Sequence, residues 1–215
     1  MLRGLLISIV SGYILSGCTN SGNQSTTEPE EADSTFMAPI EGPTATREFK
    51  TKSGKTWLVA QNQIESGLAN VTVESQGFSE ENRTVYFSEI DPVIQILQAD
   101  LDKNGFEELY FITQSVGSGS YGTIYGLNSN NDKSASEIYF EGASLYNTKT
   151  GDLYEGHMGH DDFKLVNGGL INTFPVYRDG DSNATPTGGK RKVYYALMQG
   201  EATWRLKPIR SEEVK

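Results

Sequence analysis

Short apolar runs, rich in β-branched and aromatic residues, recur along the chain between residues 56 and 206. Clusters of Gly, Asn, Asp and Ser separate these runs at the spacing that is typical of a sandwich or a barrel. The predicted strands are residues 56–60, 71–74, 84–87, 108–113, 123–127, 163–166, 170–174, 193–197 and 203–206. The pattern predicts an all-β fold, an antiparallel β-sandwich of about eight short strands with protruding hairpin loops.

Two further segments refine this prediction. The tripeptide Asn167-Gly168-Gly169 lies between two predicted strands, and asparagine followed by glycine is a strong signal for a tight hairpin turn. The segment Pro92–Ala99 is largely apolar, and its pattern fits either one or two helical turns or another strand. Periodicity alone leaves that choice open.

The chain begins with the pattern of a cleavable export signal. Arg3 precedes an apolar run over residues 5–15, which is shorter than the roughly 20 residues that a membrane-spanning helix needs. The run ends in Leu15-Ser16-Gly17-Cys18, which resembles the lipobox of bacterial lipoproteins. This resemblance implies removal of residues 1–17 as a signal peptide. It also implies that Cys18 carries diacylglycerol and palmitate and anchors the protein to a membrane.

The composition after this signal predicts a tether and then one domain. Cys18 is the only cysteine of the chain, so the fold must form without disulfides. Thr19 replaces the aspartate that retains lipoproteins on the inner membrane, so the resemblance favours the periplasmic face of the outer membrane. Residues 18–46 have almost nothing to bury and predict a flexible tether. We expect the β-sandwich domain over residues 47–208 and a polar tail over 209–215.

The overall charge narrows the range of partners. The formal net charge is −10 and the isoelectric point is near 4.7. Nucleic acid is not expected as a partner, because phosphate binding needs a cationic surface. An acidic surface either attracts basic partners or serves solubility alone, and charge does not separate these two interpretations.

An acidic segment at residues 100–108 is a candidate calcium loop. Asp100, Asp102 and Asn104 occupy alternate positions before a glycine, and Glu108 is the ninth residue of the segment. Oxygen ligands at such positions wrap a hard cation such as Ca²⁺. The twelfth position, where an EF-hand carries its bidentate glutamate, is Phe111. The alternative is an Asx-type turn, in which the same side chains bind main-chain N–H groups.

Both histidines of the chain lie in the segment Gly156–Asp162. His157 and His160, together with Asp161, have the donor types of a zinc site. The glycines of the segment argue against a helix that would bring both rings onto one face, and the chain has no third histidine. Packing and hydrogen bonding of the two rings is the favoured interpretation.

The serines of the chain do not predict an active site. Ser118 and Ser120 lie in a Gly- and Ser-rich run between two predicted strands, without the strand, turn and helix of a nucleophile elbow. The sequence also lacks a phosphate-cradling strand–loop–helix unit and an acid/base pair at a fixed spacing. We therefore expect no enzymatic activity and no required cofactor, and the run predicts a protruding hairpin.

Four segments together resemble one protein family. They are Gly105–Tyr110, Thr113–Gly122, Phe174–Tyr177 and Gly180–Gly189. In this order they resemble the periplasmic inhibitors of invertebrate-type (i-type) lysozymes, over most of the predicted domain. The resemblance implies a β-sandwich that blocks lysozyme by inserting loops into the substrate cleft of the enzyme. The lipobox and the tether depart from family members that are soluble in the periplasm.

The resemblance assigns two contact loops. The main inhibitory loop is Ser118, Gly119, Ser120 and Tyr121, and the second contact loop contains Asp181, Ser182, Asn183 and Thr187. Lysozymes cleave sugar chains between two carboxyl groups at the bottom of a cleft. Small residues keep the tip of a loop narrow, serine hydroxyls can donate to carboxylates, and a tyrosine supplies a large anchor with a polar end.

Two other functions stay open at the level of the sequence. One is a calcium-dependent binding module of the cell envelope, centred on residues 100–108, and the other is a structural lipoprotein. The sequence also leaves open the class of lysozyme and whether the protein forms a homodimer through a sheet edge.

Overall fold

The computed structural model describes residues 44–64 and 67–214. The predicted signal peptide, Cys18 and the predicted tether up to residue 43 lie outside the described residues. The described residues form twelve β-strands and one short 3₁₀ helix, Ala143–Leu145. No helix among them is long and apolar enough to cross a membrane. The prediction of an all-β protein is confirmed.

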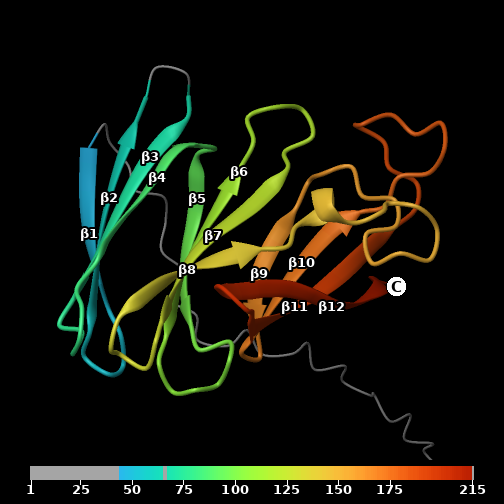
Figure 1. Cartoon of the computed structure of the whole chain (residues 1–215). Helices are drawn as coiled ribbons and strands as arrows, with labels where there is room; N and C mark the ends of the chain where they lie inside the picture. Colours follow the sequence, from blue (N-terminus) through green and yellow to red (C-terminus); the bar gives the residue numbers. More distant parts are fainter. Residues whose placement is uncertain (1–43, 65–66, 215) are drawn as a thin grey trace, which may run out of the picture.

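The first four strands form an antiparallel sheet in the order β1-β2-β3-β4. They are β1 (Thr44–Lys50), β2 (Thr56–Gln63), β3 (Ala69–Gln76) and β4 (Thr84–Ile90). Residues of β3 alternate between buried and more exposed positions, as expected when one face of a sheet covers a core. Figure 1 shows this sheet at one side of the molecule.

The other strands form an eight-stranded sheet in the order β5-β6-β7-β8-β12-β11-β10-β9. Its strands are β5 (Val93–Ala99), β6 (Glu108–Gln114), β7 (Gly122–Ser129), β8 (Ala135–Phe140), β9 (Asp162–Val166), β10 (Gly169–Pro175), β11 (Lys190–Gln199) and β12 (Trp204–Val214). All neighbours are antiparallel except β8 and β12, which pair in parallel from Trp204 opposite Ile138. The last strand therefore lies between β8 and β11, in the middle of the sheet.

Two hydrophobic cores lie on opposite faces of β5–β7. Leu109 and Phe111 of β6 belong to the first core, together with Trp57 of the four-stranded sheet. Tyr110 and Ile112 belong to the second core, which also contains apolar side chains of β9–β12. Because β6 is buried on both faces, its sequence is a continuous apolar run instead of an alternating one. The strands β5–β7 thus form a middle layer between the four-stranded sheet and the strands β9–β12 (Figure 1).

Each of the nine predicted runs falls on a strand of the structure, but most strands extend beyond the predicted run, by as much as eight residues at the end of β12. The open segment Pro92–Ala99 contains strand β5 and no helix. Two strands were not predicted, β1 and β8, because polar and charged residues interrupt their apolar positions. The sheets therefore contain twelve strands where about eight were expected.

The folded region extends beyond the predicted range 47–208 at both ends. Residues 44–46, expected at the end of the tether, pair with β2 as part of β1. Residues 209–214, expected as a polar tail, belong to β12 and pair with β11 as far as Val214 opposite Lys190. The charged side chains of this segment have partners across the strand, as where Glu213 lies 3.6 Å from Arg191. The predicted tail is therefore part of strand β12.

The predicted turn at Asn167 and Gly168 is confirmed. These two residues join β9 to β10, where Val166 pairs with Gly169. Both have positive φ angles, 50° at Asn167 and 69° at Gly168. This is the pattern of a type I′ hairpin turn, for which asparagine and glycine are the preferred residues.

Candidate functional site

The Ser118–Tyr121 segment belongs to the loop that joins β6 to β7, residues 115–121. Internal hydrogen bonds close this loop: the Ser115 N–H donates to the Tyr121 oxygen at 2.9 Å, and the Ser120 N–H donates to the Gly117 oxygen at 3.0 Å. The Tyr121 N–H donates to the Ser115 hydroxyl oxygen at 2.9 Å. The hairpin between two strands is therefore present as predicted, and it has a fixed internal structure.

Two neighbouring loops hold the tip of this hairpin from outside. The His160 N–H, in the loop that precedes β9, donates to the Gly119 oxygen at 2.7 Å. The side-chain amide of Asn183, in the β10–β11 loop, donates to the Ser118 oxygen at 2.5 Å. Figure 1 shows the β6–β7 and β10–β11 loops on the same side of the molecule. The main and the second predicted contact loops are thus in direct contact.

Glycines make this close approach sterically feasible. Gly159 has a φ of +96°, and a Cβ atom at this position would collide with the Gly119 oxygen. A Cβ atom on Gly119 would lie 2.5 Å from Cε2 of Tyr121. The sequence indicated a small residue at position 119 for the sake of a narrow tip. The structure adds that the Tyr121 ring lies directly on this glycine.

Tyr121 is half exposed, with 49% of its surface accessible. Its ring packs edge-on against His157, with the ring centroids 5.8 Å apart. Two other large apolar side chains of these loops are exposed. They are Val116 of the β6–β7 loop, at 76%, and Met158 of the loop that precedes β9, at 44%. Tyr121 is therefore fixed on one side by the loops and open to solvent on the other.

A buried carboxylate lies behind the loops. The Gly122 N–H donates to Asp161 Oδ2 at 2.8 Å, and the Asn172 amide donates to Oδ1 at 2.6 Å. His157 Nε2 lies 2.8 Å from the same Oδ1 atom. The His157 ring also packs edge-on against Phe174 at 4.6 Å. Asp161 thus connects the start of β7, strand β10 and the histidine segment.

The two histidine rings pack against neighbouring side chains and form hydrogen bonds, which is the interpretation that the sequence favoured. His157 contacts Asp161, and His160 stacks on Tyr177 with the ring centroids 6.3 Å apart. Among residues 44–64 and 67–214, no group of three metal-ligating side chains includes either histidine. The contribution of this segment to the site was missed in the sequence, although the spacing of Gly156 and Gly159 was a signal of unusual backbone geometry.

The β10–β11 loop is shaped by Asp181. Its carboxylate accepts hydrogen bonds at 2.8 Å from the N–H groups of Arg178 and of Thr187. These bonds, with that from Arg178 first, hold the pKa of Asp181 below its usual value. Ser182 shares a hydrogen bond of 2.7 Å with Thr185 within the loop. Asp181, Ser182 and Thr187 therefore organise the loop, whereas Asn183 is the predicted residue that reaches the hairpin.

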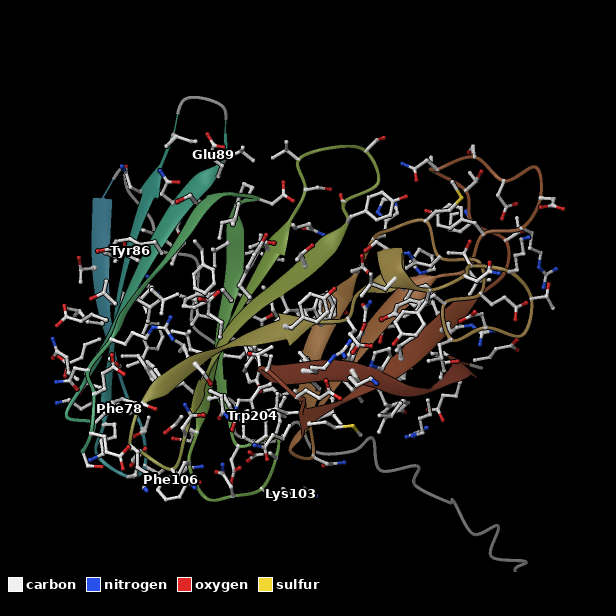
Figure 2. All side chains as sticks on the ribbon, in the orientation of Figure 1. Phe78, Tyr86, Glu89, Lys103, Phe106 and Trp204 are labelled. Carbon is white, nitrogen blue, oxygen red and sulfur yellow. The ribbon has the colours of Figure 1, made fainter. Side chains whose placement is uncertain are left out.

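The predicted calcium residues lie at the opposite end of β6. Asp100, Asp102 and Glu108 come together, with one carboxylate oxygen of each within 4.8 Å of the others. Asn104 supports the loop, because its side chain donates to Asp102 at 2.9 Å and its Oδ1 accepts from the Phe106 N–H at 2.7 Å. Figure 2 labels Lys103 and Phe106 of this loop, at the end of the sheet that is far from the β6–β7 loop.

No protein-family model, curated protein or solved structure matches this chain. What the described residues define is an all-β protein with three mutually bonded loops at one end and an acidic loop at the other.

Proposed function

We propose that this protein is an inhibitor of lysozyme, with the i-type enzyme as the favoured target, and that the β6–β7 loop enters the active-site cleft. The observation that carries the proposal is the hydrogen bond from Asn183 to Ser118. It joins two of the four segments whose sequences resemble the lysozyme inhibitor family, Thr113–Gly122 and Gly180–Gly189. Two distant segments that serve one interface are expected to lie side by side, as these do.

The hydrogen bonds that hold the hairpin in one conformation support a role in binding. A loop that is fixed before it binds loses less conformational entropy on association than a flexible one. The Ser118 and Gly119 oxygens already accept hydrogen bonds from the neighbouring loops. The loop thus presents a narrow tip of small residues that needs little rearrangement to enter a cleft.

The free polar groups of the hairpin suit a cleft that contains carboxyl groups. The hydroxyls of Ser118 and Ser120 have no hydrogen-bond partner among the described residues. They can donate to the ionised carboxylate of a lysozyme and accept from the protonated carboxyl group. In this arrangement they occupy the place of sugar hydroxyls or water between the two catalytic groups.

Tyr121 is the proposed anchor. Its exposed half offers apolar area and a phenol group, and its packing on Gly119 and His157 restricts the ring. Rigid, partly exposed aromatic residues of this kind often dominate the energy of an interface. The net charge of −10 also favours association with basic proteins, mainly through the association rate.

We propose that the protein acts in the periplasm. The predicted lipid on Cys18 and the tether would hold the inhibitor on the periplasmic face of the outer membrane, beside the peptidoglycan that it protects. The chain then needs no catalytic step of its own, because it acts by occupying the cleft of another enzyme.

Cell-wall lysis by i-type, c-type and g-type lysozymes, with and without the full chain, tests the proposal. We expect stoichiometric inhibition of the i-type enzyme, with a faster onset at low salt than at physiological salt. Absence of inhibition of every class at an excess of the protein would reject the proposal.

A further inference from the structure

We propose that Asp100, Asp102 and Glu108 bind one Ca²⁺ ion, which fastens the β5–β6 hairpin at the end of β6 opposite the Ser118–Tyr121 loop. This inference concerns a separate site and does not depend on lysozyme inhibition. It rests on the geometry of three carboxylates and on an unpartnered buried oxygen atom.

The distances fit a single ion. One oxygen of each carboxylate lies within 4.8 Å of the other two. Calcium binds oxygen ligands at about 2.3 to 2.6 Å, so two ligands on opposite sides of one ion lie up to about 5 Å apart. All three donors are oxygen atoms, which suits a hard cation such as Ca²⁺ and disfavours metals that prefer nitrogen or sulfur.

Glu108 supplies the independent observation that points to a ligand. Its side chain is completely buried, at 0% exposure. Oε2 accepts hydrogen bonds from the Leu101 N–H at 2.8 Å and from the Tyr110 hydroxyl at 3.1 Å. Oε1 is buried and has no hydrogen-bond partner among the described residues. A buried carboxylate oxygen without a partner is unfavourable unless a cation or a proton neutralises the group.

The electrostatics of the cluster agree with this geometry. Burial, followed by the charges of Asp102 and Asp100, raises the pKa of Glu108 to about 8. Burial and the neighbouring Asp100 also raise the pKa of Asp102. The loop thus gathers three carboxyl groups that repel one another when all are ionised, and a divalent cation at their centre reverses the sign of that interaction.

The loop already holds its aspartates in place. The N–H groups of Asn104 and Gly105 each donate to the Asp100 carboxylate at 2.9 Å. Asp102 accepts from Asn104 through the main chain at 3.0 Å. Each carboxylate oxygen has two lone pairs, so these bonds leave room for an ion. Asn104, predicted as a ligand, is in this arrangement a positioning residue, and the Asx-type turn and the ion site are compatible.

The neighbouring carboxylate provides a matched control. Glu107 precedes Glu108 but pairs with Lys52 of the β1–β2 turn, with Oε1 3.2 Å from Nζ. Its other oxygen accepts from the Lys52 N–H at 2.8 Å. Glu107 therefore connects the loop to the four-stranded sheet and does not belong to the proposed ion site.

The test is the thermal unfolding of the full chain after removal of metal with a chelator. We expect about 1 mM Ca²⁺ to raise the midpoint temperature by about 5 °C. Isothermal titration calorimetry is expected to give one Ca²⁺ per chain. Asp102→Asn should abolish both the temperature shift and the binding heat, whereas Glu107→Gln should keep both.

A second variant keeps the test decisive if Asp102→Asn does not fold. Glu108→Gln preserves the shape of the buried side chain and should also abolish calcium binding, while its far-ultraviolet circular dichroism stays that of a β protein. The proposal is overturned if the unmodified protein shows no shift with Ca²⁺, or responds only to Mg²⁺. It is equally overturned if Asp102→Asn or Glu108→Gln still binds one Ca²⁺ with unchanged affinity.

Discussion

The side-chain amide of Asn183 donates a hydrogen bond of 2.5 Å to the main-chain oxygen of Ser118, across a separation of 65 residues in the chain. The main-chain oxygen of Asn183 accepts in turn from the Tyr177 hydroxyl at 2.9 Å. Asn183 is thus itself positioned from two sides. The order of the hairpin tip depends on a loop that lies far away in the sequence.

Replacement of Asn183 by alanine should loosen the hairpin without unfolding the protein. The variant loses the bond to Ser118 but keeps the main-chain oxygen that Tyr177 binds. We expect faster amide hydrogen exchange in residues 116–121 and inhibition of i-type lysozyme weakened by about tenfold. Asp179→Asn, in the same loop, is the control and should change neither, because the Asp179 side chain is exposed and does not contact the hairpin. Unchanged amide exchange in the Asn183 variant would show that the hydrogen bond from Asn183 does not hold the hairpin tip in place.

Gly119→Ala should weaken inhibition more than Gly117→Ala. A Cβ atom on Gly119 would lie 2.5 Å from the Tyr121 ring and displace it, whereas a Cβ atom on Gly117 meets nothing within 4 Å. We expect both variants to unfold within about 3 °C of the unmodified protein, because the loop is at the surface. Inhibition assays compare the two, and equal inhibition would show that the ring position is irrelevant.

Tyr121→Ala should cost about 2 kcal/mol of binding energy, which corresponds to an inhibition constant raised by about 30-fold. The matched control is Tyr86→Ala, because Tyr86 is 70% exposed on the four-stranded sheet and lies far from the loops (Figure 2). Titration of i-type lysozyme with each purified variant gives the two constants. A Tyr86 variant that loses as much inhibition as the Tyr121 variant would argue for a different binding surface.

Asp161→Ala should destabilise the fold by about 3 kcal/mol, since it leaves buried donors without an acceptor. The affected groups are the Gly122 N–H, the Asn172 amide and the His157 ring. Asp162→Ala is the control, because the Asp162 carboxylate pairs with Lys164 at the surface. Urea unfolding gives the free energy of unfolding of each variant. Similar values for the two variants would show that the hydrogen bonds accepted by Asp161 do not stabilise the fold.

In the presence of a chelator, the stability of the protein should fall as the pH rises from about 5 to about 9. Burial raises the pKa of Glu108 to about 8 from an ordinary value of 4.5. Between these values the folded protein keeps the proton and the unfolded chain has lost it, so the stabilisation is complete below the ordinary pKa and lost as the pH rises through about 8.

The slope of this dependence tests its origin. Glu108 contributes at most about 1.4 kcal/mol per pH unit to the free energy of unfolding. Glu108→Gln should flatten the dependence, whereas Glu107→Gln should preserve it. Urea unfolding at several pH values provides the measurement, and a slope that persists in Glu108→Gln would assign it to other groups.

The strands could be predicted where apolar residues form an uninterrupted or regular pattern. The run from Leu109 to Ile112 is buried on both faces, and its continuity indicates a strand within a middle layer, although the existence of two cores was not predicted. Strands β1 and β8 escaped prediction because neighbouring strands, and not their own composition, determine their pairing.

The candidate site was predictable in its parts but not in its assembly. The sequence named the hairpin and the β10–β11 loop separately. The hydrogen bond from His160 to Gly119 depends on main-chain geometry, because the donor is the main-chain N–H group and Gly159 allows the two loops to approach each other. Such a contact between distant loops leaves no periodic signal in one sequence.

The insertion of β12 between β8 and β11 has a consequence for the order of folding. Trp204 pairs with Ile138, so the middle of the eight-stranded sheet closes only when segments of high sequence separation meet. Pairings of this kind raise the contact order and slow folding. Leu206 is fully buried in the second core, so β9–β11 cannot complete that core before β12 arrives. We therefore expect the four-stranded meander to form early from local hairpins and the eight-stranded sheet to close later.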